Sequence, residues 1–266
     1  MRVLLKRIVL LALCVAAIFL LYDHVKRERE AANAPETEEE AALPAEAETQ
    51  SVSVLRVGEG VTMGRVLENT EHGGIDVVLE EEDGTENVRT FTDVSIDSWY
   101  TTAVNFVVSA GLMNGVGDEP IFRPEFGMLR ESFAAILYRY TNGESVEPRR
   151  HFDDVVEGSW YCDAVSWVTN ERLMTPLETN LFGVGSYMTC EQTLVCLYRL
   201  AGSPQTDGSL ADYPYAAKVS DSGRSAVDWA WKNGLITEDE CVWYPTQAVS
   251  RAQVALLLMR MSAMPK

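Results

Sequence analysis

The chain begins with a strongly segregated hydrophobic and polar pattern. An uncharged run from Ile8 to Tyr22 follows Arg2, Lys6 and Arg7, and it has the length of a signal-peptide core but is short for a membrane-spanning helix. Charged residues follow the run directly, where a cleavage site would need small ones. We therefore expect residues 1–29 to be an uncleaved N-terminal membrane helix, with a cleaved signal peptide as the alternative.

The next segment, residues 30–51, has no hydrophobic periodicity. It is rich in Ala and Glu and contains Pro35 and Pro44, a composition that buries too little apolar surface to offset the entropy lost on ordering. We expect an acidic linker. A short Ala/Glu helix between the two prolines is the alternative, and either would act as a spacer.

Residues 52–90 show short β-like runs separated by turn signals. Apolar and β-branched residues gather at 61–67, 75–79 and 88–91, with His72-Gly73-Gly74 and Asp83-Gly84 between them. This pattern predicts a small β-meander. Three strands in about 40 residues are marginally stable alone, so we expect the meander to pack on its neighbour.

From Phe91 onward the pattern repeats about every 60 residues. Each copy has apolar residues at helical spacing, a long loop and a second apolar helical stripe. The pattern predicts three helix-loop-helix units over residues 91–149, 150–205 and 206–266, which share one core because a single helix pair cannot cover its own apolar stripe. The motifs of the first copy are Phe91-Thr-Asp93-Val94, Trp99-Tyr100, Ala103-Val104, Gly111-Leu112, Phe122-Arg-Pro124 and Tyr138-Arg139.

The start of the second helix carries the most informative residues. Thr189-Cys190-Glu191-Gln192 and Ser250-Arg251-Ala252-Gln253 have the form of capping boxes. Arg251, and Arg130 at the same place in the first copy, put a cation in a first helical turn, which opposes the helix dipole by roughly 0.3–1 kcal/mol. That placement suggests an anionic ligand. For Arg130 a local ion pair with Glu125 or Glu131 is the alternative.

Charge and composition narrow the function classes. The 266 residues include 40 acidic and 22 basic ones, a formal net charge of −18, so nucleic acid is excluded as a partner by repulsion. Five cysteines match no zinc spacing, although a Cys162–Cys190 disulfide is possible in an exported region. No catalytic motif is present. We therefore expect neither a cofactor, nor a metal site, nor an enzyme.

The ordered motifs resemble the S-layer homology (SLH) domains of bacterial envelopes, over Phe91 to Met261. The resemblance implies three repeats in a pseudo-threefold bundle, whose grooves bind a secondary cell-wall polysaccharide that is often pyruvylated. The expected fold class is thus mainly α, with three helix-loop-helix repeats preceded by the β-meander and the membrane helix.

The resemblance also implies a set of polysaccharide-binding residues. The arginine of the helix-start motif corresponds to Arg130 and Arg251, whereas the second copy has Cys190, which cannot make the bidentate contacts of a guanidinium. The remaining candidates are the motif aspartates and tryptophans, although a tryptophan at helical spacing is more often a core residue. These candidates are Asp93, Asp154, Asp221, Trp99 and Trp160.

Two functions from different classes follow. The first is a non-catalytic cell-envelope protein on the extracytoplasmic face, membrane-tethered or secreted to the wall, that binds wall polysaccharide through Arg130 and Arg251. The second is a membrane-anchored interaction scaffold, whose degenerate repeats contact another envelope protein and no longer bind glycan.

Overall fold

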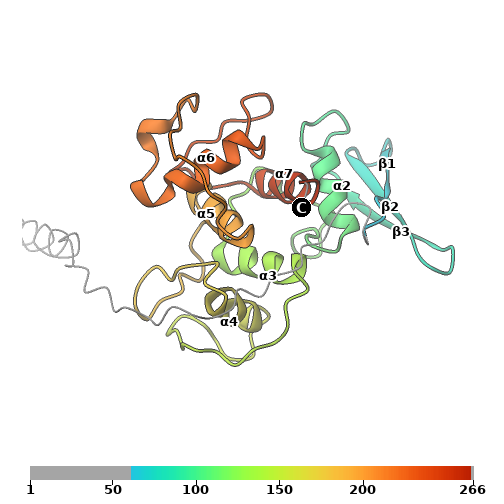
Figure 1. The fold of residues 1–266 in the computed structure, drawn as a ribbon. Helices are drawn as coiled ribbons and strands as arrows, with labels where there is room; N and C mark the ends of the chain where they lie inside the picture. The colour runs from blue at the N-terminus through green and yellow to red at the C-terminus, as the bar shows by residue number, and fades with distance from the viewer. Residues whose placement is uncertain (1–60, 265–266) are drawn as a thin grey trace, which may run out of the picture. The chain divides into compact units, whose positions relative to one another are not determined.

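The structure is a computed structural model that describes residues 61–264, all within one compact unit. These residues form six α-helices and a three-stranded sheet (Figure 1). The elements are β1 (Arg65–Glu68), β2 (Ile75–Glu80), β3 (Glu86–Phe91), α2 (Thr101–Ser109), α3 (Arg130–Tyr140), α4 (Cys162–Asn170), α5 (Cys190–Leu200), α6 (Arg224–Lys232) and α7 (Arg251–Ser262), with short 3-10 turns at Ala216–Lys218 and Asp221–Gly223.

The predicted β-meander is present as an antiparallel sheet in the order β1-β2-β3. Ile75 lies opposite Glu68 on one side and opposite Phe91 on the other. The turn before β2 requires glycine at position 74, where φ is +78° and a Cβ atom would lie 2.1 Å from the carbonyl oxygen of Phe91.

The sheet is fastened to α2 and contributes to the core. Ile75 and Val77 are fully buried. Asn105 of α2 donates a hydrogen bond from Nδ2 to the carbonyl oxygen of Gly64 (2.8 Å), and the Gly64 amide donates to Ser109 Oγ (2.9 Å). Figure 1 shows the sheet beside this helix.

The prediction of a mainly α fold class is wrong. Within residues 61–264 the helices are only 9 to 12 residues long and long loops join them. The antiparallel sheet adds its own buried face to the same hydrophobic core. The fold is therefore mixed α and β, because the sheet is an integral layer of the core instead of an appendage to a helical bundle.

The N-terminal part of that prediction also receives no support. The membrane helix over 1–29 and the linker over 30–51 lie outside the described residues. None of the helices between residues 61 and 264 combines the length and the apolarity that crossing a bilayer needs.

Three extended segments meet immediately before α3, α5 and α7. The Met128 amide donates to the Val249 carbonyl (2.8 Å), the Met188 amide to the Met128 carbonyl (2.8 Å), and the Val249 amide to the Met188 carbonyl (2.9 Å). We call this closed set of three backbone hydrogen bonds the central ring. Around it the helices pack as α2 with α7, α3 with α4 and α5 with α6.

The two capping boxes that the sequence predicts are present at the helix starts beside the central ring. Thr189 and Ser250 each form a complete capping box with the glutamine three residues later. Leu129 occupies the corresponding N-cap of α3 with similar extended dihedrals, but it has no side-chain acceptor for the helix amides. One of the three starts is therefore uncapped.

Candidate functional site

Arg130, in the first turn of α3, is directed at the loop that precedes α5. The residue is 2% exposed. Its Nε donates to the carbonyl oxygen of Phe182 (3.0 Å) and its Nη2 to that of Thr175 (2.7 Å), while the guanidinium carbon lies 5.1 Å from the centroid of the Phe182 ring. The guanidinium therefore fastens the second predicted repeat to the first. This use also explains why a cation is tolerated in a first helical turn.

Arg251, in the first turn of α7, binds the long loop of the first predicted repeat and so joins the third predicted repeat to the first. Its Nε donates to Phe122 O (2.8 Å) and its Nη2 to Asn114 O (2.7 Å), and the guanidinium lies 4.7 Å from the Phe122 centroid. Burial lowers the pKa of Arg251 to about 10, against the opposing attraction of Asp93. The side chain is thus still charged at neutral pH.

Cys190, the first residue of α5, occupies the position that Arg130 and Arg251 occupy in α3 and α7. Cys190 is 2% exposed and too short to reach the neighbouring loop as an arginine does. The carbonyl oxygen of Trp243, which stands where Phe122 and Phe182 stand in the other copies, instead accepts a hydrogen bond from the Tyr213 hydroxyl. Sequence reasoning missed Tyr213, because it lies in a segment that has no counterpart in the repeated motifs.

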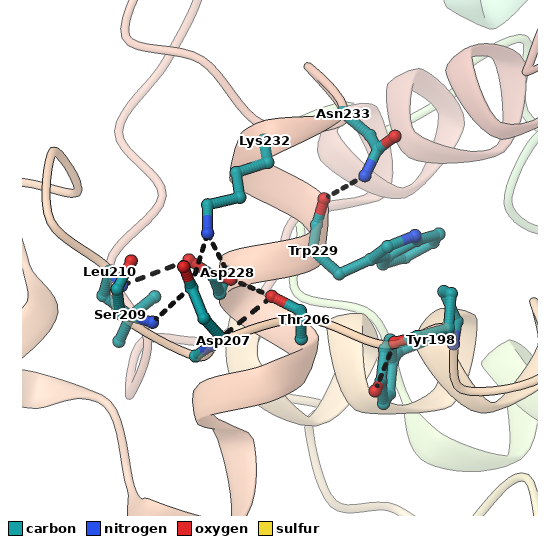
Figure 2. A network of polar contacts seen from close by, with 11 residues as sticks. Tyr198, Thr206, Asp207, Ser209, Leu210, Asp228, Trp229, Lys232 and Asn233 are labelled. Atoms are coloured by element: carbon teal, nitrogen blue, oxygen red, sulfur yellow. Dashed lines mark hydrogen bonds and ion pairs between the residues drawn. The ribbon is translucent and has the colours of Figure 1, made fainter.

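Tyr213 follows shortly after residues 206–210, and this preceding segment is hydrogen-bonded to α6. Figure 2 shows the contacts of the segment with the helix. Asp228, fully buried, accepts hydrogen bonds from the Leu210 amide (3.1 Å), from Lys232 Nζ (3.0 Å) and from the Thr206 hydroxyl. Lys232 also pairs with Asp207. These contacts hold residues 206–210 against the helix, directly before Tyr213.

Two of the three predicted aspartates organise loops within their own repeat. Asp93 accepts hydrogen bonds from the amides of Phe122 and Arg123, both at 2.7 Å. Asp154 accepts three, from the amides of Phe182 (2.8 Å) and of residues 183 and 184 (both 2.7 Å). Asp221 differs, because it is exposed in a 3-10 turn at the start of α6. The structure does not give it the geometry of the other two.

The two predicted tryptophans also differ from one another. Trp99 is half-buried against the hydrophobic core, with its ring edge-on to Tyr100 at 5.0 Å between centroids. Trp160 makes the same kind of contact with Tyr161 (5.2 Å) but is 65% exposed. Of the pair, Trp160 therefore offers much more indole surface to a partner.

A cavity of about 470 Å³ lies where α3 starts beside α5. We call it the Arg199 cavity. Its volume falls in the range of small-ligand sites, roughly 300–1,000 Å³. Residues that line it include Arg130, Thr175, Leu177, Glu191, Gln192 and Arg199.

Arg199 is the accessible cation of this cavity. It is exposed, and its Nη1 donates to Thr175 Oγ1 (3.0 Å) and to the Leu173 carbonyl oxygen (3.3 Å). Among the described residues its hydrogen bonds all come from Nη1. Nε and Nη2, the edge that binds a carboxylate with two parallel hydrogen bonds, are therefore left for a ligand. The sequence offered Arg199 only as part of the recurring Tyr-Arg pair.

The four described cysteines form no disulfide, and two of them are buried. Cys162, Cys190, Cys196 and Cys241 are free thiols, so the Cys162–Cys190 disulfide considered from the sequence is absent from the structure. Burial raises the pKa of the Cys190 thiol to about 12, and that of Cys196 also to about 12. At neutral pH both therefore remain protonated and unreactive.

Residues 90–134 match the S-layer homology domain family. The match supports a location at the cell envelope or surface and attachment to a cell-wall polymer. It covers most of the first predicted repeat, including Arg130. That the second and third repeats belong to the same family stays a prediction.

Two curated proteins are similar over most of the chain. One is the exoglucanase XynX of Acetivibrio thermocellus, 22% identical over 64% of this chain and 16% of its own length. The other is an amylopullulanase of Thermoanaerobacterium thermosulfurigenes, also 22% identical over 64% of this chain, and 9% of its own length. The chain thus spans less than a fifth of either relative.

Proposed function

We propose that the protein is a non-catalytic envelope component that attaches to a secondary cell-wall polysaccharide through the Arg199 cavity. The observation that carries the proposal is the free Nε/Nη2 edge of Arg199 in a cavity that also contains Arg130, a residue of the segment matching the S-layer homology domain. A polymer with carboxylate groups, such as a pyruvylated glycan, has the charge and the geometry for that edge.

The charge of the cavity supports this ligand despite the acidic chain. Glu191 lines the cavity, but its carboxylate accepts hydrogen bonds from the Ser220 amide (2.9 Å) and hydroxyl (2.5 Å). Its charge is thus partly satisfied within the protein. Exposed charges are screened beyond about 8 Å at physiological ionic strength, so the nearby guanidinium has more influence on a bound anion than the formal charge of −18.

Co-sedimentation of the full chain with wall sacculi tests this function. We expect binding that is lost when the secondary polymer is removed, and that falls about tenfold in Arg199→Gln, equivalent to about 1.4 kcal/mol. Arg89→Gln, at an exposed position on β3, removes the same charge from a distant element and should leave binding unchanged. Binding that persists without the polymer, or that both variants reduce equally, would contradict the proposal.

A protein-interaction scaffold is the second candidate, and one surface feature favours it. Phe126 and Tyr187 are 43% and 48% exposed, and their ring centroids lie 5.9 Å apart. The Tyr187 ring lies over Gly127, where a Cβ atom would come within 2.7 Å of it. This aromatic pair offers an apolar contact surface near the central ring. Under this function, Phe126→Asp would abolish in-cell cross-links to another envelope protein while sacculus binding stays unchanged.

A further inference from the structure

The chain contains three Asn-Gly pairs, and the fold restrains them differently. They are Asn114-Gly115, Asn142-Gly143 and Asn233-Gly234. In such a pair the backbone nitrogen of the glycine can attack the asparagine side chain, because glycine has no Cβ atom to hinder the approach. The attack needs a glycine amide that can give up its proton and an asparagine side chain that can turn toward it. These two requirements separate the three pairs.

In two of the pairs the glycine amide is already used. The Gly143 amide donates to the carbonyl oxygen of Tyr138 (2.8 Å), and the Gly234 amide donates to that of Trp231 (3.1 Å). Both hydrogen bonds close the C-terminal end of a helix, α3 in the first case and α6 in the second. Asn233 also donates from its side-chain amide to the last turn of α6. Attack in either pair therefore has to break a backbone hydrogen bond first.

Asn114-Gly115 is free of these restraints. The pair lies in the loop between α2 and α3, and both residues are exposed. Between residues 61 and 264 the Gly115 amide donates no hydrogen bond, and the Asn114 side chain makes none. No helical hydrogen bond has to open before this side chain approaches the amide.

Arg251 makes the same amide more acidic. Its Nη2 donates to the carbonyl oxygen of Asn114 (2.7 Å), which belongs to the same peptide group as the Gly115 nitrogen. When that nitrogen loses its proton, the negative charge moves largely onto the carbonyl oxygen, and a guanidinium bonded to this oxygen stabilises the charged form. Within the described part of the chain no cation donates to the corresponding oxygens of Asn142 and Asn233.

We propose that Asn114 is a site of spontaneous deamidation in the folded protein. The Gly115 nitrogen gives its proton to the solvent and forms a bond to Cγ of Asn114, and the side-chain nitrogen takes up a proton and leaves as ammonia. The product of this step is a succinimide ring. Water then opens the ring at one of its two carbonyl carbons. Opening at Cγ gives aspartate, whereas opening at the former main-chain carbonyl gives isoaspartate, in which the chain continues through Cβ and Cγ.

Either product puts a carboxylate on the residue that Arg251 contacts. In isoaspartate this carboxylate is the former main-chain carbonyl, which is the group that accepts the hydrogen bond from Nη2. A neutral acceptor is then replaced by an anion, so the link between the first and third predicted repeats becomes an ion pair as the protein ages. The inference concerns this link and does not depend on polysaccharide binding.

Peptide mapping by mass spectrometry tests the inference on the full chain, incubated at mildly alkaline pH. The gain in mass when an amide becomes an acid gives the rate at each of the three asparagines. In the folded chain we expect Asn114 to react about tenfold faster than Asn142 and Asn233, because breaking one ordinary backbone hydrogen bond slows a reaction by up to about that factor. In urea that unfolds the chain, we expect the three rates to converge. Equal rates in the folded chain, or a ranking that urea leaves unchanged, would overturn the inference.

Two matched variants locate the reaction in the intact folded chain. Asn114→Gln lengthens the side chain by one methylene group and makes ring closure much slower, so the gain in mass of the whole chain should nearly stop. Asn233→Gln makes the same change at another exposed asparagine and should leave the wild-type rate. A gain at the wild-type rate in Asn114→Gln, or an equal reduction in both variants, would show that Asn114 is not the reactive residue.

Discussion

Asp154, which the sequence analysis proposed as a polysaccharide-binding residue, uses its carboxylate to accept hydrogen bonds from backbone amides. Burial alone would raise the pKa of its carboxyl group, but the hydrogen bonds from three successive amides outweigh that effect and lower the pKa below its ordinary value. Arg130 and Arg251 are used in a comparable way, on carbonyl groups. These residues fix the loops that precede the second helix of the first two predicted repeats.

The depressed pKa of Asp154 predicts a pH dependence of stability. A carboxylate whose pKa is lower in the folded state stabilises the protein above its unfolded pKa, about 3.9, and loses that effect as the pH falls through the folded value. We expect Asp154→Asn to lower the free energy of unfolding by about 2 kcal/mol at pH 7, and by less at pH 2–3. Urea denaturation at several pH values measures this difference.

The neighbouring Asp153 provides the control for that experiment. Its side chain is exposed, so Asp153→Asn should change the free energy of unfolding by less than about 0.5 kcal/mol at every pH. If the two variants lost the same stability at pH 7, the three amide hydrogen bonds would not be the cause.

Residue-level prediction from sequence was limited by what the repeated motifs contain. Arg130, Arg251 and the aspartates recur at fixed spacing, so they could be found. Their actual partners, such as Phe182 O for Arg130, lie 52 residues away and depend on how the loops fold. Tyr213 had no such signal. Its role became visible only when its hydroxyl was seen at the Trp243 carbonyl.

At the scale of elements, the three helix starts around the central ring differ in one respect. Thr189 and Ser250 cap α5 and α7 with side-chain oxygens, but Leu129 leaves the first amides of α3 without this partner. The backbone at Leu129 has φ −73° and ψ 147°, close to the values of −84° and 162° at Thr189. A threonine therefore fits position 129 without a change of backbone.

We expect Leu129→Thr to stabilise the protein by about 0.5–1 kcal/mol through the new N-cap. Thermal unfolding followed by circular dichroism at 222 nm measures the effect. Leu129→Ala removes the same leucine but supplies no cap, so it should not be stabilising. A gain that is equal in both variants would show that removal of the leucine, and not the cap, is responsible.

Short-range elements were predicted better than the fold class. The strands and the capping boxes depend on neighbouring residues, which a pattern reveals. Packing of the sheet on its neighbour was also expected, because three short strands are marginally stable alone. The fold class was wrong because it depends on how much of the core the sheet supplies, and the contact of Gly64 with Asn105 and Ser109 joins segments more than 40 residues apart. Periodicity contains no information about that contact.

At the scale of the whole molecule, the sheet and the helices share one core, and we expect them to unfold together. Ile75 is fully buried between the sheet and that core. Ile75→Ala should therefore cost about 2–5 kcal/mol and should lower the denaturation midpoints of sheet and helices equally. Hydrogen exchange of β2 and α7 amides, followed along a urea titration, measures both.

Val88→Ala is the matched control, since Val88 lies on β3 but is 51% exposed. It should change the free energy of unfolding by less than about 0.5 kcal/mol. Loss of β2 protection at a lower urea concentration than α7 protection in the Ile75→Ala variant would show instead that the sheet is a separate unit.

The central ring also sets a limit on when folding can be completed, because its hydrogen bonds join residues that are far apart in the sequence. Val249 and Arg251 hold the first predicted repeat from near the end of the chain, with the hydrogen bonds of Arg251 joining residues 129 and 137 positions apart. Contacts of such long sequence separation form late and slow folding. During synthesis the ring therefore stays open until Val249 has left the ribosome, so the loops that precede α3 and α5 wait for the third predicted repeat before they reach their final hydrogen bonds.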